Sequence, residues 1–246
     1  MKKIKNYVNE CKVLLRDIPS LVLVMFVLSV VCMNLLANKE LLSTKYLALD
    51  CGFTLSWISF LCMDVICKRY GPKAANQISF LTLGINLLMC IAFNLLSRTP
   101  GMWGEFYSTS DPEIGAAINN ALNNTIGGTW YILLGSSFAM LIASLTNSTT
   151  NWLLGRTFSD DSYKHFAIRS FISTTLAQFV DNLIFAVLIS KTFFGWTWTQ
   201  IIICSITGAF FELLCEVIFS PLGYNITKQW KEDGVGKKYL EYIGGK

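Results

Sequence analysis

The sequence has little charge and almost no histidine for its length. Only 15% of its 246 residues are charged, whereas a soluble domain carries about 25%. His165 is the single histidine, and no two of the eight cysteines form a Cys-x-x-Cys pair, so the spacing of common zinc sites is missing. A glycine-rich nucleotide-binding loop and a basic run with interleaved aromatics are also absent. These absences argue against a metal site, a cofactor, an ATPase and a nucleic-acid partner.

Long apolar runs take the place of the missing charge. Hydrophobic residues make up 53% of the chain, and they gather in stretches that reach the roughly 20 residues needed to cross a bilayer. We therefore predict an all-α integral membrane protein with a single domain over residues 1–246. Its six spans are expected at about 19–37, 47–67, 76–96, 129–154, 166–189 and 199–219, the last one ended by Pro221.

Lysine and arginine are distributed unevenly between the two sides of these spans. The N-terminal arm, the turn at 68–73, the stretch at 156–169 and the C-terminal tail hold 16 of them, while the other loops hold four. Cytoplasmic loops carry the excess of basic residues, so we place both termini in the cytoplasm. In the longest outward loop, 97–127, apolar residues recur every fourth position from Ile114 to Ile126. This pattern predicts an amphipathic helix over the outer mouth, either as a gate or as a plain interfacial helix.

Polar residues inside the spans are the strongest functional signal. A carboxylate at the bilayer centre costs at least about 2.5 kcal/mol, so an ionisable residue there marks a candidate site. Asp181 and Gln178 share one face of the fifth span with Thr174, at spacing i, i+4 and i+7. Acidic groups without Lys or Arg at the same depth suggest proton binding, cation binding or a ligand that carries hydrogen-bond donors. The many amides and aromatics among the span residues favour a flat, nitrogen-rich ligand over a simple ion pore. The candidate substrate-binding residues are Asp181, Gln178, Asn182, Glu212, Asn86, Asn34 and Trp57.

A second group of polar residues lies toward the ends of the spans. The pairs Asn147–Asn151 and Glu212–Glu216 have i, i+4 spacing, so each pair presents one polar stripe to the bundle. Amides of this kind also hold membrane helices together by hydrogen bonds. We predict a gating or structural role for Asp64, Glu216, Asn147, Asn151 and Asn38.

Four motifs appear in order along nearly the whole chain. They are Asn-Leu-Leu-Ala-Asn-Lys at 34–39, Asp64-Val65-Ile66 with Tyr70-Gly71-x-Lys73-Ala74-Ala75, Ser-Thr-x-x-x-Gln-x-x-Asp at 173–181, and Glu216-Val217 followed by Pro221. With these motifs the chain resembles the queuosine-precursor transporter family, also called the vitamin uptake transporter family. The resemblance implies a fold similar to the substrate-binding components of energy-coupling-factor transporters.

The resemblance further implies an importer of the bacterial inner membrane, not an enzyme. Its substrate would be a 7-deazaguanine such as queuine or aminomethyl-deazaguanine, or the nucleoside, salvaged for tRNA modification. A carboxylate accepts the adjacent N1–H and 2-amino donors of such a base, and amides meet its other edges. Trp57 is expected to stack on the ring. Glu212 stands where the family commonly has Lys, so we expect it to attract an amine on the ligand.

Two other interpretations stay open. One is a vitamin-binding component of an energy-coupling-factor transporter, which works with separate ATPase subunits. The other is a membrane enzyme acting on lipid, for which the sequence lacks histidines, metal-ligand clusters and an activated nucleophile. Neighbouring genes for queuosine modification of tRNA would favour the importer of queuosine precursors. Neighbouring genes for ATPase subunits would favour the energy-coupling-factor component. The sequence leaves open whether the chain forms homo-oligomers or recruits energising subunits.

Overall fold

Long helices dominate the computed structural model, which describes residues 2–128, 130–158 and 162–244, with the backbone alone for residues 2–5 and 216. The long helices that run side by side are α2 (Ser20–Leu36), α3 (Phe53–Tyr70), α4 (Pro72–Leu96), α6 (Trp130–Gly155), α7 (Tyr163–Phe185) and α9 (Trp198–Glu232). The shorter elements are α1 (Lys2–Asp17), β1 (Glu40–Ser43), β2 (Ala48–Asp50), η1 (Gly104–Ser108), α5 (Pro112–Gly128), the π-helical turn η2 (Ala186–Ser190), α8 (Lys191–Phe193) and α10 (Lys237–Gly244).

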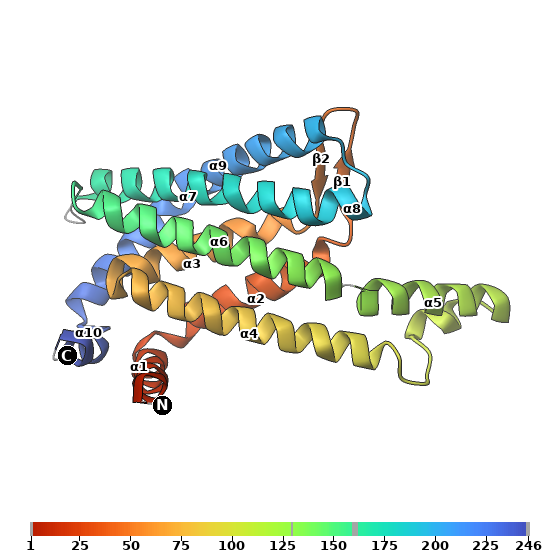
Figure 1. Cartoon of the computed structure of the whole chain (residues 1–246), viewed down its shortest axis with the longest axis horizontal. Helices are drawn as coiled ribbons and strands as arrows, with labels where there is room; N and C mark the ends of the chain where they lie inside the picture. The colour runs from red at the N-terminus through yellow and green to blue at the C-terminus, as the bar shows by residue number, and fades with distance from the viewer. Residues whose placement is uncertain (1, 129, 159–161, 245–246) are drawn as a thin grey trace.

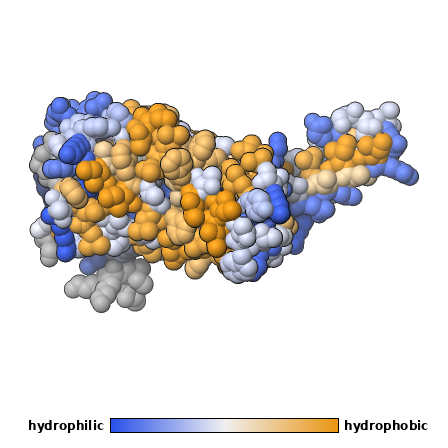
Figure 2. All heavy atoms as spheres, turned by 90° about the horizontal axis from the view of Figure 1, so that it is seen from above, coloured by the Kyte–Doolittle hydropathy of each residue, from blue (hydrophilic) through white to orange (hydrophobic). Residues whose placement is uncertain are grey.

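The bundle has two distinct ends. Both chain termini lie at one of them, beside α1 and α10, and we name this the terminal end (Figure 1). The antiparallel pair β1–β2 lies at the other, which we name the hairpin end. Hydrophobic surface gathers along the middle of the bundle and hydrophilic surface toward its ends (Figure 2). This distribution is the one expected for a protein that crosses a bilayer.

Several helices have the length and hydropathy of membrane spans. Among the described residues there are four such stretches, Pro72–Leu96, Pro112–Gly155, Tyr163–Phe193 and Trp198–Cys215. A fifth is added if α1 and α2, bent by 108° at their junction, count as one span. Helix α3 is apolar at its start but carries Asp64, Lys68 and Arg69 toward its end. The protein is therefore a predominantly helical, multi-pass membrane protein.

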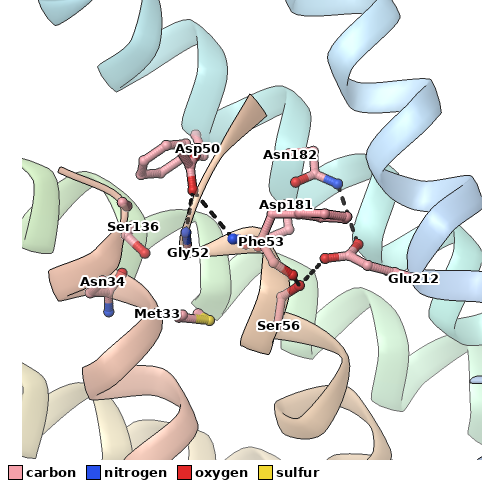
Figure 3. Close-up of a pocket in the computed structure, with 12 residues that line it drawn as sticks. Met33, Asn34, Asp50, Gly52, Phe53, Ser56, Ser136, Asp181, Asn182 and Glu212 are labelled. Carbon is pink, nitrogen blue, oxygen red and sulfur yellow. Dashed lines mark hydrogen bonds between the residues drawn. The ribbon is translucent and has the colours of Figure 1, made fainter. Parts of the chain in front are cut away.

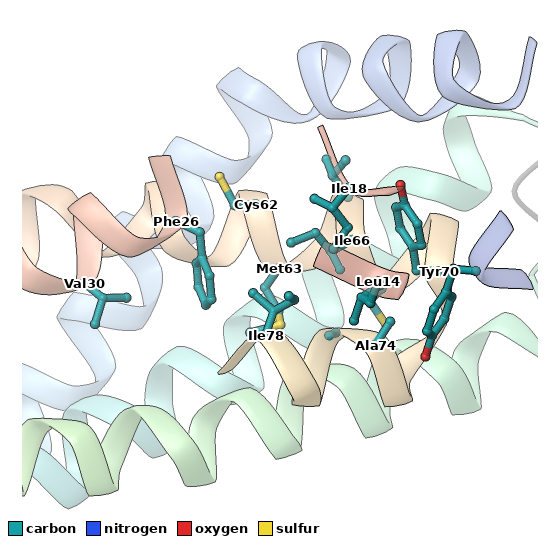
Figure 4. Close-up of a cluster of buried hydrophobic side chains, with 14 of the residues drawn as sticks. Leu14, Ile18, Phe26, Val30, Cys62, Met63, Ile66, Tyr70, Ala74 and Ile78 are labelled. Carbon is teal, nitrogen blue, oxygen red and sulfur yellow. The ribbon is translucent and has the colours of Figure 1, made fainter. Parts of the chain in front are cut away.

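The main hydrophobic core lies toward the terminal end. Side chains from α2, α3 and α4 meet there, and Leu14 of α1 and Ile18, the residue that follows α1, insert among them (Figure 4). Tyr70 at the end of α3 packs against Trp230 of α9 and Tyr239 of α10, with ring centroids 6.1 and 6.0 Å apart. Both terminal segments are thus fixed to the same end of the bundle.

The second predicted span begins later than its hydropathy suggested. Residues 47–50 were expected to be helical, but β2 and the turn before it occupy them, and α3 starts at Phe53. The reason is local: Asp50 Oδ1 accepts hydrogen bonds from the backbone N–H groups of Gly52 and Phe53 at 2.8 and 3.3 Å. An aspartate that binds the next free N–H groups begins a helix rather than continuing one.

The last predicted span ends later than expected. Pro221 was expected to stop it, but α9 continues through Pro221 to Glu232. Proline cannot donate to the carbonyl four residues earlier, which here is that of Val217. The Ser220 hydroxyl donates to this carbonyl at 3.3 Å instead, so the missing hydrogen bond is replaced and the helix persists.

The predicted outer-loop helix forms but does not cover the bundle. Asp111 Oδ1 accepts hydrogen bonds from the N–H groups of Glu113 and Ile114. Asp111 therefore caps the start of α5, as expected for an aspartate that precedes a proline at the first helical position. However, α5 projects beyond the ends of α4 and α6 (Figure 1). Trp103 donates its backbone N–H to Asn119 at 2.8 Å and its indole N–H to Asn123 at 2.7 Å. The outer loop therefore packs on its own helix, and the expectation of a cover over the mouth is wrong.

Candidate functional site

A polar pocket lies between the helices, toward the hairpin end. It is lined by residues of α2, β2, α3, α6, α7 and α9, namely Met33, Asn34, Ala37, Asp50, Gly52, Phe53, Ser56, Ser136, Asp181, Asn182, Phe185 and Glu212 (Figure 3). Three carboxylates are among these described lining residues, and no basic side chain is. The lining residues are far apart in the sequence, from Met33 to Glu212, so they come together only in the folded bundle.

Asp50 is the carboxylate that the hairpin contributes. Its Oδ1 is held by the backbone N–H groups of Gly52 and Phe53. Burial raises the pKa of Asp50 to about 6, against the lowering effect of these two hydrogen bonds. Gly52 permits this arrangement, because a Cβ there would lie 2.3 Å from the Met33 carbonyl oxygen on α2. The start of α3 thus approaches the backbone of α2 closely beside the pocket.

Glu212 of α9 is surrounded by neutral hydrogen-bond donors. The Ser56 hydroxyl donates to its Oε1, and Asn182 Nδ2 donates to its Oε2 at 3.4 Å (Figure 3). Gln178, with its amide oriented so that the nitrogen faces Glu212, donates to both oxygens. Gln178 is fully buried and is not among the described lining residues of the pocket. Gln178 therefore contacts Glu212 of α9, although its spacing puts it on the same face of α7 as Asp181.

Two pocket residues carry buried polar atoms without a partner. Neither amide atom of Asn34 has a hydrogen-bond partner within the described chain, and neither does Oδ1 of Asp181. Asn34 is only 1% exposed. Buried polar groups in native proteins are nearly always hydrogen-bonded, so an unpartnered one asks for an explanation. Both residues line the same pocket, which therefore offers two unused acceptors, on Asn34 and Asp181, and one unused donor, on Asn34.

Three of the predicted gating or structural residues, Asp64, Asn147 and Asn151, form a separate cluster nearer the terminal end. Asp64 accepts hydrogen bonds from Asn147 at 2.8 Å, Asn151 at 3.2 Å, Thr174 at 3.4 Å and the Ser170 hydroxyl. Lys68 Nζ lies 3.8 Å from Asp64 Oδ2, with both side chains fully buried. The structure therefore joins α3, α6 and α7 through one buried polar network.

Trp57, Asn86 and Asn38 are not among the described lining residues of the pocket. Trp57 stacks on Phe219, with ring centroids 4.1 Å apart and planes at 10°. Asn86 donates to the Ser137 hydroxyl at 2.6 Å, and Asn38 to the Leu35 carbonyl at 3.0 Å. The side chain of Glu216 lies outside the described residues. Among the predicted binding residues, Asn34, Asp181, Asn182 and Glu212 line the pocket.

Sequence reasoning missed Asp50, Ser56 and Ser136. Asp50 had a detectable signal, because an Asp followed two residues later by Gly before an apolar run is typical of a capped turn. The two serines had none, since serine is common in membrane helices and only the partner across the bundle distinguishes one from another. Ser56 matters because it binds Glu212, 156 residues away in the chain.

Comparison with known proteins gives one match. A family model described as a putative vitamin uptake transporter matches residues 50–226. No curated protein and no solved structure matches the chain. The matched region begins at Asp50 and includes Asp181 and Glu212, so it contains all three carboxylates of the pocket.

Proposed function

This chain belongs to the vitamin uptake transporter family. We propose that it imports a queuosine precursor across the bacterial inner membrane. The precursor is a 7-deazaguanine such as queuine or aminomethyl-deazaguanine. We further propose that the polar pocket binds this molecule. The supporting observation is the pocket lining, which has three carboxylates, unpartnered atoms on Asp181 and Asn34, and no basic residue among the described members. Such a lining suits a small molecule rich in donors and able to carry positive charge.

Each part of the proposed ligand has a matching group in the pocket. The N1–H and 2-amino groups of a deazaguanine lie side by side, and a carboxylate such as Asp181 accepts both. Asn34, with a donor and an acceptor unused, pairs with the oxygen or nitrogen atoms on the other edges. The amine of aminomethyl-deazaguanine or queuine then pairs with Glu212.

The present pocket is too small for a base. Its cavity volume is about 40 Å³, room for about three water molecules at roughly 10–15 Å³ each. Binding a deazaguanine therefore requires the walls to separate. The wall that belongs to no long helix is the hairpin with Asp50, so we propose that ligand entry begins with its displacement.

We also propose the membrane arrangement that import requires. The six long helices are taken as six spans of one domain, with both termini in the cytoplasm. This orientation follows from the excess of Lys and Arg at the terminal end, and it places the pocket nearer the outer face. A ligand from outside then reaches the pocket before the buried network around Asp64.

Competition binding on purified protein tests the assignment of Glu212. Glu212→Gln removes the charge that pairs with the ligand amine. A hydrogen bond to a charged group contributes roughly 1.5–3 kcal/mol, so the affinity of the variant for aminomethyl-deazaguanine should fall about tenfold. Affinity for the cyano analogue, which has no amine, should change little.

Glu105→Gln, in η1 of the projecting outer loop, is the matched control and should leave both affinities unchanged. An equal change for both ligands in Glu212→Gln would refute the pairing. The transport activity itself is tested by uptake of radiolabelled queuine into cells that lack their own synthesis, where absence of uptake would contradict the proposed substrate.

A further inference from the structure

A second pocket, with a different chemistry, lies at the terminal end of the bundle. It has a volume of about 250 Å³ and is formed where the end of α3, the start of α4, the end of α6 and the first half of α7 meet. Its described lining is Cys67, Lys68, Gly71, Pro72, Trp152, Gly155, Arg156 and Arg169. Three of these side chains are basic and none is acidic, the reverse of the polar pocket described above.

The two inner basic side chains are held in place by the bundle. Lys68 Nζ donates to the Ser170 hydroxyl at 2.5 Å and forms an ion pair with Asp64. Arg169 donates to the side-chain and backbone oxygens of Asn151 at 2.8 and 3.3 Å. Both residues are less than 10% exposed, at 8% and 7%. Their positions are therefore set before any ligand arrives, which reduces the entropy lost on binding.

The absence of a side chain at Gly155 makes room for one of them. A Cβ on Gly155 would lie 2.7 Å from Nη2 and 2.8 Å from Cζ of Arg169. The guanidinium thus lies directly against the end of α6, and this contact brings it to the pocket wall.

The rim of the pocket supplies further positive potential. The Arg156 guanidinium lies over the Trp152 ring at 3.9 Å, and no hydrogen bond from it to another described residue is found. Gly71 and Pro72 begin α4, a helix of 25 residues whose N-terminus has no side-chain cap and no acidic residue in its first turn. The N–H groups and dipole at such a helix start favour an anion.

We propose that this pocket binds a phosphate group. One guanidinium group can donate two parallel hydrogen bonds to two oxygens of a phosphate. Basic pockets between helices at the cytoplasmic side of membrane proteins bind anionic lipid headgroups. Trp152 at the rim, 42% exposed, is the kind of residue that lies at the headgroup level. The phosphate belongs either to an anionic phospholipid or to a free phosphate in solution, whichever molecule the protein transports.

Native mass spectrometry of the full chain tests the proposal. The purified protein in neutral detergent is titrated with phosphatidylglycerol and with phosphatidylcholine of the same acyl chains. Phosphatidylglycerol should bind with higher affinity, and Arg156→Gln should weaken that binding roughly tenfold. Because Arg156 is exposed, the variant should fold. Arg98→Gln, an exposed arginine at the opposite end of α4, is the matched control and should bind as the parent chain does.

Inorganic phosphate added as a competitor distinguishes the two sources. Displacement of phosphatidylglycerol by millimolar phosphate supports a site for free phosphate, and resistance to it supports a lipid headgroup site. Gly155→Ala provides a second variant, which should also weaken binding because it displaces the Arg169 guanidinium. Equal affinity for the two lipids, or equal phosphatidylglycerol affinity in Arg156→Gln and Arg98→Gln, would overturn the proposal.

Discussion

Asp181 combines two properties that few carboxylates in membrane helices share. Its Oδ1 is buried without a hydrogen-bond partner in the described structure, and it faces a pocket rather than another helix. Asp64, by contrast, is buried among at least four hydrogen-bond donors. Full satisfaction is what a structural carboxylate requires. The difference supports a ligand-binding role for Asp181 and a structural one for Asp64.

Asp181→Asn tests this ligand-binding role directly. The amide keeps the size of the side chain but replaces one acceptor oxygen with a donor, which faces the donor edge of the base. We expect the affinity for queuine to fall about tenfold or more, because a hydrogen bond to a charged acceptor contributes roughly 1.5–3 kcal/mol. The measurement is equilibrium binding, with Asp233→Asn at the exposed end of α9 as the control. Unchanged affinity in Asp181→Asn would contradict the assignment.

Asp50 predicts a pH dependence of binding. Its pKa is raised to about 6 by burial, so it gains its negative charge as the pH rises through that value. An aliphatic amine on the ligand titrates above this range, as the lysine amine does at about 10.4, so it stays protonated between these pH values. Affinity for an amine-bearing ligand should therefore increase several-fold between about pH 5 and pH 7.

Asp50→Asn removes the group that titrates and should flatten this part of the pH profile. The profile is measured by binding in a series of buffers of equal ionic strength, because salt also screens the attraction. Asp181 and Glu212 face the same pocket, so the comparison of the two profiles, rather than the parent profile alone, isolates Asp50. The same rise in both proteins would exclude Asp50 as its source.

At the scale of elements, the hairpin β1–β2 is fastened to the start of α9. Trp196 Nε1 donates to Glu40 Oε1 at 3.1 Å, and Gln200 Nε2 donates to the Thr44 carbonyl at 3.0 Å. Ala48 of β2 is buried with Trp196 and Ile201 in a small hydrophobic cluster. These few contacts hold the element that carries Asp50, which supports the proposal that the hairpin moves before any long helix does.

Gln200→Ala should therefore speed ligand exchange. The substitution removes one hydrogen bond between hairpin and helix, with a net contribution of about 0.5–1.5 kcal/mol. If this bond is lost when the hairpin moves, the association and dissociation rates of the ligand should both rise, by roughly twofold to tenfold. Stopped-flow binding measures both rates. Glu113→Gln, on the projecting helix α5, serves as the control, and unchanged rates in Gln200→Ala would argue against hairpin displacement.

Helix α7 connects the polar pocket with the buried network. Its residues Thr174, Gln178 and Asp181 share one face, and in the structure they contact Asp64, Glu212 and the pocket in turn. The π-helical turn η2 follows on the same helix directly after Phe185 of the pocket wall. Such turns are frequent at functional sites. One helix thus carries polar groups from the hairpin end toward the terminal end.

At the scale of the whole molecule, the network around Asp64 lies between the pocket and the terminal end. Asp64→Ala removes the carboxylate that accepts from Asn147 and pairs with Lys68. Removing one partner of a buried ion pair costs about 3–5 kcal/mol, so the amount of folded protein and its thermal stability should fall before ligand affinity changes.

The exposed ion pair Lys228–Glu232 provides the comparison. Exposed pairs contribute about 0–1 kcal/mol, so Glu232→Ala should have little effect on the melting temperature in detergent. Normal expression and melting of Asp64→Ala, together with loss of ligand binding, would show instead that Asp64 acts on the ligand.

The sequence by itself determined the class of protein, most of the helix positions and the family. Hydropathy and chain length are local properties, and a run of apolar residues must form a helix in a bilayer because its backbone groups have no water to bind. The same cost made Asp181 and Glu212 recognisable as unusual, and both line the pocket. The motifs from 34–39 to Pro221 identified the family whose model matches residues 50–226.

Only the tertiary structure decided which polar residues meet. Ser56 and Glu212 are 156 residues apart, and Asn151 and Asp64 are 87 apart, so no local pattern relates them. Trp57 looked as suitable for a ligand as Asn34, yet one stacks on Phe219 and the other faces the pocket. The helical period tells which residues share a face, but the rotation and partners of each helix are set by packing across the whole bundle. Pro221 did not end α9 for a different reason, which is local: the Ser220 hydroxyl donates to the Val217 carbonyl within the same helix.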